Sequence, residues 1–378
     1  MLHRGWWLVT SVYLVVDAQL AAAQLVLIGV AQAFVGLVFE VPAGVVADTL
    51  SRKWSLVVSH ALMGVAMLAT GLVSDFLPLL ATQMLWGLSW TFASGADVAW
   101  ISDELDDPAL VPAVLLRAER AQLTGTVAGL ATIGALAWLT GRAPAMVLTG
   151  AAMVVLGVGV LIGFPERHFV AAPARRWSAA GSILADGVRL VRGSRLLIAV
   201  FTATLLVNGV TGAFGRLYPR QLVALAPQLD PVLWLAGLGT LMALASAATL
   251  RFAQPRIGRP GTVRRGYIAA CAAATAGIVG LVAARGPIGG SLAVLVAAGA
   301  LPLTRSFGTI WVNSQTAGPV RATVLSLLAQ ADYAGTILCG LAVAVIADLS
   351  GMVMALTVCI ALLIIADVTV QRWALPPA

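Results

Sequence analysis

The chain has 378 residues, of which 60 % are hydrophobic and only 10 % charged, and its formal net charge is +7. Soluble domains carry about 25 % charged residues and cannot enclose this much apolar surface, so a water-soluble globular protein is excluded. Apolar runs of about 20 residues span a bilayer as helices, and no barrel-like alternation is present. The composition therefore predicts an all-α polytopic membrane protein. The bases lie between the apolar runs, which indicates membrane topology and argues against nucleic-acid binding.

Twelve apolar segments follow one another along the chain. They span residues 4–20, 23–47, 54–73, 77–101, 118–140, 143–164, 195–217, 231–252, 263–285, 288–312, 321–347 and 351–371. The first segment is short, and we expect further residues upstream of Met1. The longest connection divides the segments six plus six. The expected domains are therefore a bundle over 1–164, a linker over 165–194 with an interfacial amphipathic helix at 177–192, and a bundle over 195–378.

The two halves of the chain show matching features at a nearly constant offset. Trp100 and Trp311 both stand at the end of an apolar segment, 211 positions apart. Gly125 and Gly335 follow similar residues and lie 210 positions apart. These offsets predict an internal repeat, so the two six-helix bundles are expected to be pseudo-symmetric, with sites at their interface.

The distribution of bases predicts the orientation of the chain. With the N-terminus inside, 18 of the 23 bases lie on the cytoplasmic side, and the positive-inside rule then places both termini in the cytoplasm. We expect a multi-pass protein of a bacterial-type inner cell membrane. The three cysteines lie inside apolar runs, so neither a disulfide framework nor a metal site is expected. No Walker motif or nucleophile–base pattern occurs, so neither a cofactor nor enzymatic activity is predicted.

Charge is concentrated in one short loop after the second apolar segment. Here Gly44, Asp48, Arg52 and Lys53 follow one another at spacings of four, four and one. Gly44 permits close approach of a neighbouring helix, and Arg52 is within reach of Asp103 at the end of the fourth segment. These five residues form the predicted gating motif, which latches the two halves in one conformational state. The alternative is that the bases only enforce topology.

The loop Gly44-x-x-x-Asp48-x-x-x-Arg52-Lys53 between spans two and three resembles the signature loop of the major facilitator superfamily (MFS). Thr49 stands where that family commonly has a base, and Ser51 where it has a second glycine. The resemblance extends over the whole chain through the twelve-span plan and the long central loop. It implies a monomeric secondary transporter in which spans one, four, seven and ten line a midplane cavity.

Polar and aromatic residues recur on one face of the fourth span, where Gln83, Trp86 and Trp90 lie three or four positions apart. This face either lines a water-filled cavity or packs closely against another helix. Together with Asn208 and Arg305 in spans seven and ten, these residues are the predicted substrate-cavity set. Gln83 stands where the family often has an arginine, and the fifth span lacks the Gly-Pro element of the family's antiporters.

Ionisable residues inside spans are costly and are functional candidates by default. Arg305 and Asp332 are expected to pair in the second half, either as an anion- or proton-coupling site or as a structural ion pair. The predicted coupling residues are Asp17, Glu40, Asp97 and Asp332. The alternative for Asp17 is that it simply lies at the outer of the two interfaces between the bilayer and water.

These features favour proton-coupled efflux of a small organic molecule by alternating access. The expected partners are that substrate, protons and the lipid bilayer. Two alternatives stay open: an importer or uncoupled facilitator of the same fold, and a membrane protein that serves in binding or assembly without transporting.

Overall fold

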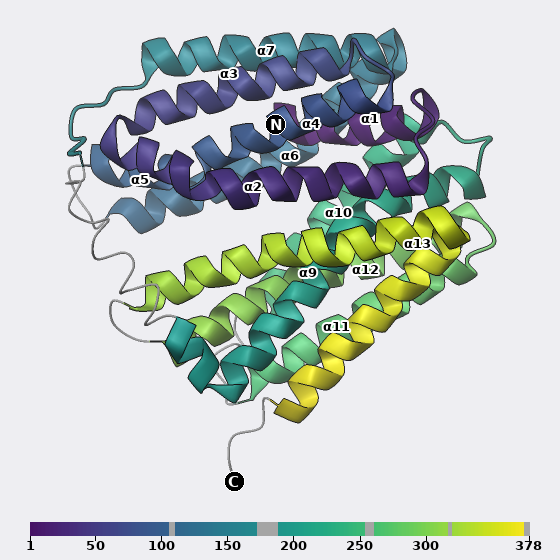
Figure 1. Ribbon diagram of the computed structural model, residues 1–378. Helices are drawn as coiled ribbons and strands as arrows, with labels where there is room; N and C mark the ends of the chain where they lie inside the picture. The colour runs from purple at the N-terminus through teal and green to yellow at the C-terminus, as the bar shows by residue number, and fades with distance from the viewer. Residues whose placement is uncertain (106–109, 172–187, 254–260, 317–319, 374–378) are drawn as a thin grey trace. The chain divides into compact units, whose positions relative to one another are not determined.

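The computed structural model describes residues 1–105, 110–171, 188–253, 261–316 and 320–373, and within these ranges the regular structure is helical throughout (Figure 1). The helices of the first half are α1 (Leu2–Val16), α2 (Ala22–Thr49), α3 (Arg52–Thr70), α4 (Phe76–Ala93), α5 (Ala96–Glu104), α6 (Val111–Thr140) and α7 (Arg142–Gly163). Those of the second half are α9 (Arg195–Leu225), α10 (Pro231–Ala253), α11 (Thr262–Ala283), α12 (Pro287–Gln315) and α13 (Val320–Trp373). The all-α prediction is confirmed.

Short polar signals in the sequence fix several helix ends. Ser51 is the N-cap of α3, where its hydroxyl accepts a hydrogen bond from the backbone N–H of Trp54, and Ser194 caps α9 in the same way. Gly95 has a φ of +75°, which separates α4 from α5 inside the predicted fourth span. Gly351 has a φ of +81° and joins two helices that together make up α13.

Nine helices in the described ranges are long and apolar enough to cross a bilayer, and one of them is the double helix α13. Helices α1, α4 and α5 are outside this set. These helices support a multi-pass membrane protein, while the count of twelve spans stays a prediction. The predicted interfacial helix at 177–192 lies largely outside the described residues, of which 188–193 are helical.

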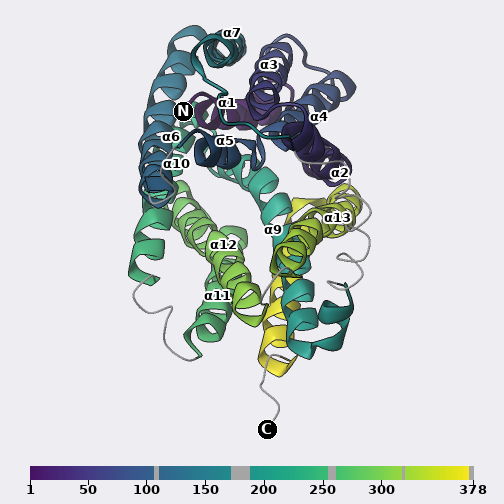
Figure 2. The ribbon, with the colours of Figure 1, turned by 90° about the vertical axis from the view of Figure 1, so that its left-hand side faces the viewer.

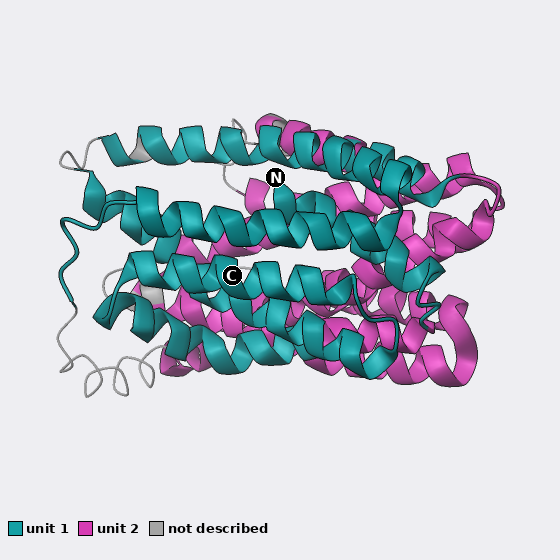
Figure 3. Ribbon diagram, turned by 90° about the horizontal axis from the view of Figure 1, so that it is seen from above, with its two compact units in different colours: residues 1–20, 31–176, 230–240 teal, residues 21–30, 177–229, 241–378 magenta. Residues whose placement is uncertain are grey.

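The chain forms two compact units (Figure 3). Unit 1 comprises residues 1–20, 31–176 and 230–240, and unit 2 comprises 21–30, 177–229 and 241–378. The start of α2 therefore belongs with the second half, and the start of α10 with the first. The domain boundaries at 164 and 195 remain a prediction.

Within unit 1, α3 packs side by side with α7 (Figures 1 and 2), and α1 packs against α6 and α7. Small residues set the distance between α3 and α7. A Cβ on Gly64 would lie 2.8 Å from the Val154 backbone nitrogen, and one on Gly71 would lie 2.8 Å from the Ala143 carbonyl oxygen. Close backbone approach through small residues is how helices associate in lipid, where no hydrophobic force joins them.

Within unit 2, the most extensive packing is between α9 and α13, and α11 packs against α12 (Figure 2). Gly335 of α13 faces the backbone of Leu205 so closely that a Cβ would collide with its carbonyl oxygen. Gly277 of α11 meets Ala293 and Ala297 of α12 in the same way. Both helix pairs are thus held at a separation that only glycine permits.

Candidate functional site

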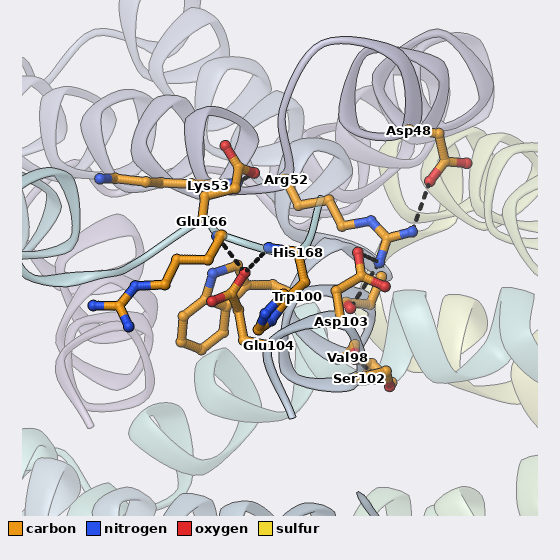
Figure 4. A network of polar contacts seen from close by, with 12 residues as sticks. Asp48, Arg52, Lys53, Val98, Trp100, Ser102, Asp103, Glu104, Glu166 and His168 are labelled. Carbon is orange, nitrogen blue, oxygen red and sulfur yellow. Dashed lines mark hydrogen bonds and ion pairs between the residues drawn. The ribbon is translucent and has the colours of Figure 1, made fainter. Parts of the chain in front are cut away.

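Arg52, the first residue of α3, is the centre of a polar network in unit 1 (Figure 4). Its Nη1 donates a hydrogen bond to the Ala99 carbonyl at 2.7 Å and contacts the Asp103 carboxylate, both on α5. Asp48 lies farther from it, at 3.8 Å, and its side chain is 57 % exposed. The predicted reach of Arg52 to Asp103 is confirmed. The guanidinium joins α3 to α5.

The segment 164–169, which follows α7, fastens the same network from the other side (Figure 4). The Glu166 carboxylate accepts hydrogen bonds from the Ser51 hydroxyl at 2.6 Å and from the Lys53 backbone N–H at 2.9 Å. An acid at this position complements the unpaired N–H groups and positive dipole of the α3 N-terminus. Trp100 of α5 donates to the Pro165 carbonyl at 2.8 Å and stacks on Phe164.

Glu104, at the end of α5, binds the backbone of the same segment, 164–169, through its side-chain carboxylate. One carboxylate oxygen accepts the N–H groups of Arg167 at 2.7 Å and His168 at 3.1 Å. Burial acts to raise the pKa of Glu104, but these hydrogen bonds and the charges of both residues outweigh it, so the pKa lies below its ordinary value. The Glu104 carboxylate is therefore ionised at neutral pH in the conformation with these hydrogen bonds.

The other predicted gating residues contribute differently. A Cβ on Gly44 would meet no atom of the described residues within 4 Å, so the structure shows no close helix approach at Gly44 within the part of the chain that it describes. Lys53 engages through its backbone while its side chain points away from Arg52 (Figure 4). Asp97 is exposed in the first turn of α5, and Glu40 accepts a hydrogen bond at 2.7 Å from Ser94, at the α4–α5 break.

A second polar cluster lies inside unit 2, where α9, α12 and α13 bring three predicted residues together. Asp332 accepts a hydrogen bond from the Asn208 amide at 2.7 Å, and its other oxygen lies 3.2 Å from Arg305. The expected Arg305–Asp332 pair is confirmed as a contact. The Arg305 side chain is 67 % exposed and that of Asp332 only 16 %, so the carboxylate is enclosed while the guanidinium is open.

Trp86 and Trp90 of α4 join three residues of α1 in an aromatic cluster, made of His3, Trp6, Trp7, Trp86 and Trp90. The Trp86 ring stacks with Trp6 and Trp7 at centroid distances of 6.0 and 5.1 Å. Trp90 meets Trp86 edge-on at 5.7 Å and His3 edge-on at 5.2 Å. These are favourable aromatic distances and angles. The predicted substrate-cavity set does not include Trp6, Trp7 or His3, although their spacing places them on one face of a helix.

Gln83 lies apart from the aromatic cluster and is fully buried. Its side-chain oxygen accepts a hydrogen bond from Gln32, and its amide donates to the Thr70 hydroxyl, both at 3.2 Å. Thr70 donates in turn to Thr82 at 2.9 Å. The amide therefore joins α2, α3 and α4, and in this structure it has no exposed surface.

Asp17 stands at the C-cap of α1 and forms a two-point ion pair with Arg142, the first residue of α7, at 2.5 and 3.0 Å. A paired carboxylate at helix ends fits the interface reading of Asp17, while its coupling role stays a prediction. Arg216 of α9 was not proposed from the sequence, yet it is only 8 % exposed and lies beside Gly29. A buried arginine inside a span is a functional candidate. The residues around Arg216 in the sequence do not reveal that its side chain is buried.

No family model and no curated protein sequence matches this chain. Solved structures do match it over nearly its full length. A variant of the nucleoside transporter NupG matches with a TM-score of 0.80 and 15 % identity, over 98 % of this chain and 95 % of that one. A bacterial homologue of the human lysosomal transporter Spinster matches with 0.72 and 13 %, over 100 % and 97 %. A variant of the peptide transporter POT matches with 0.77 and 11 %, over 99 % and 92 %.

These neighbours all have the fold of MFS transporters, and none of them is an enzyme. The chain therefore has the MFS fold, as its signature loop indicated. Identities of 10–16 % establish the fold alone.

Proposed function

We propose that the chain is a secondary transporter that moves a small organic molecule across a membrane by alternating access. The observation that carries this proposal is the match of 98–100 % of the chain to transporter structures. A largely enclosed, hydrogen-bonded Asp332 beside an open Arg305 inside apolar helices supports it, because such groups mark substrate or ion pathways in membrane proteins.

In this proposal the Arg52 network is the gate. Arg52 holds α5 against α3, and Glu166 and Glu104 fasten the segment 164–169 over the same helix ends. A latch of this kind has two states, closed with these contacts made and open with them broken. Gly44 and Asp48 at the end of α2 and Lys53 at the start of α3 are assigned to the same gate.

Coupling is assigned to Asp332. Arg305 and Asn208 stabilise its ionised form, and protonation would release Arg305 for an anionic or polar group. Proton antiport with export is the mode we propose, in an inner cell membrane with both termini in the cytoplasm. The bases in the first turns of α3 and α11, which include Arg52 and Arg264, support this orientation. Asp17, Glu40 and Asp97 are secondary candidates for coupling.

Reconstituted vesicles test the proposal. The purified protein is placed in liposomes, offered a mixed panel of nucleosides, dipeptides and aromatic metabolites, and uptake is measured by mass spectrometry with and without a pH gradient. We expect gradient-dependent accumulation of at least one compound. Asp332→Asn keeps an acceptor for Asn208 but loses the titratable charge, so it is expected to retain exchange at equal concentrations and lose gradient-driven accumulation.

The same assay separates the alternatives. Uptake that ignores the pH gradient, with Asp332→Asn unchanged, would identify a facilitator and remove the coupling role. The direction of the productive gradient distinguishes an importer from an exporter. A protein that serves in binding or assembly would take up none of the compounds. Cells that carry Arg52→Lys in place of the wild-type protein would then grow and function like wild-type cells, because no gate is needed.

A further inference from the structure

The aromatic cluster has a feature that packing alone does not require: buried polar atoms without partners. Trp6 is 0 % exposed, and no residue in the described ranges accepts a hydrogen bond from its Nε1. Three further atoms are buried without a partner in the described residues: Trp86 Nε1, His3 Nε2 and the hydroxyl of Thr10, which lies one turn from Trp6 and is 1 % exposed.

Leaving a buried donor unsatisfied is unfavourable, and most buried polar groups in proteins have partners. Three of these atoms belong to the aromatic cluster and the fourth, the Thr10 hydroxyl, lies one turn from Trp6, so together they indicate that another molecule supplies their hydrogen bonds. Indole nitrogens only donate. The missing molecule therefore carries acceptor atoms, such as a carbonyl oxygen or a ring nitrogen.

The rings of the cluster define the shape of that molecule. Trp86 already stacks with two indoles at interplanar angles of 27° and 23°, so the ring faces lie nearly parallel. The cluster is not sealed, because Trp90 is 37 % exposed and Trp7 and Trp86 are half-buried. A further flat ring can extend this stack, whereas a puckered ring cannot match its planes.

We propose that the aromatic cluster binds a flat, uncharged heteroaromatic ring that carries hydrogen-bond acceptors. The identification of this ligand as the transported substrate rests on the proposed function. Indole faces also attract quaternary cations. A quaternary ammonium has no acceptor atom and would leave the N–H groups of Trp6 and Trp86 unsatisfied.

The test is calorimetric titration of the full chain in detergent with four probes. Uracil and caffeine are flat rings with carbonyl acceptors. Dihydrouracil has the polar groups of uracil on a puckered ring, and tetraethylammonium is the cation probe. We expect both flat rings to bind, and dihydrouracil to bind about tenfold more weakly than uracil, as expected from loss of aromatic stacking.

Variants of one tryptophan assign the binding to the cluster. Trp86→Leu removes the ring and is expected to weaken uracil and caffeine binding about tenfold or more. Trp86→Phe keeps a ring but removes the N–H, so a loss of about threefold to tenfold is expected, and it keeps the test valid should the leucine variant misfold. The control is Trp138→Leu on α6, whose side chain is 57 % exposed, and binding should change less than about twofold.

Several results would overturn the inference: no binding of either flat ring, equal binding of uracil and dihydrouracil, binding of tetraethylammonium alone, or equal losses in the Trp86 and Trp138 variants. Binding requires neither a gradient nor two compartments. Intact ring binding without transport in liposomes would therefore refute the proposed function alone, and transport without ring binding would refute only this inference.

Discussion

Replacing Arg52 with lysine tests whether the Arg52 network holds α5 in place. The guanidinium Nη1 reaches the Ala99 carbonyl and the Asp103 carboxylate together, whereas the lysine ammonium ends one bond earlier along the side chain and cannot hold both partners in this geometry. Its longer contact with Asp48, which is exposed, contributes little. The variant therefore loses one charged hydrogen bond, a loss of about 1.5–3 kcal/mol.

The Arg52 side chain is 19 % exposed, so water compensates in part and we take the lower end, about 1.5 kcal/mol. This corresponds to about a tenfold increase in the opening equilibrium of α5. Hydrogen exchange measured by mass spectrometry reports that equilibrium directly. We expect peptides covering 96–104 to exchange about tenfold faster in Arg52→Lys, with peptides from α9 unchanged.

The control is Arg120→Lys on the exposed face of α6, where exchange over 96–104 should match the wild type. Exchange of 96–104 within about twofold of wild type in a folded Arg52→Lys protein would refute the reasoning. Equal acceleration in the Arg120 variant would also refute it, because the effect would then not depend on the contacts that Arg52 makes.

Three further predictions concern stability in detergent. The pKa of Glu104 is depressed in the folded protein, so the ionised carboxylate stabilises the fold fully at neutral pH, and this stabilisation is lost as the pH falls through the lowered pKa. The melting temperature of Glu104→Gln should therefore lie below that of the wild type at pH 7 and converge with it in acid. Gly335→Ala should destabilise α9–α13 packing by about 1–3 kcal/mol, whereas Gly299→Ala, where a Cβ meets nothing within 4 Å, should leave the melting temperature unchanged or raised. Gln83→Leu should cost about 1–2 kcal/mol by breaking a buried interhelical network, and a melting temperature equal to wild type would contradict this.

The sequence predicted the fold well because lipid imposes a simple rule on it. Long apolar runs must be helices, and every predicted apolar segment coincides with helix in the described residues. The break at Gly95 inside the fourth span was missed, because a single glycine in an apolar run is equally compatible with continuous helix. Its positive φ depends on the surrounding packing, which the local sequence does not contain.

The candidate sites were predicted in part, and the pattern has a physical cause. The Arg52–Asp103 and Arg305–Asp332 contacts were foreseen because charge is rare in this chain, both at span ends and inside spans, and must find a partner. Glu166 and Glu104 were missed because they lie at or just beyond helix ends, where acids are common, and because their partners include backbone N–H groups that the sequence does not mark. Trp6 and Trp7 were not predicted for the site, since position near a span end alone does not reveal which helix a ring faces.

Alternating access is tested most directly by side-specific labelling of a residue next to Arg305. Thr309 is exposed one turn away on α12, and the native cysteines of the chain are all buried, so Thr309→Cys provides a single reactive thiol. In oriented vesicles a membrane-impermeant maleimide should label this thiol when it is added on either side. Arg52→Lys should raise the labelling rate from one side and lower the labelling rate from the other. Labelling from one side only, under every gradient and in both proteins, would contradict transport by this chain.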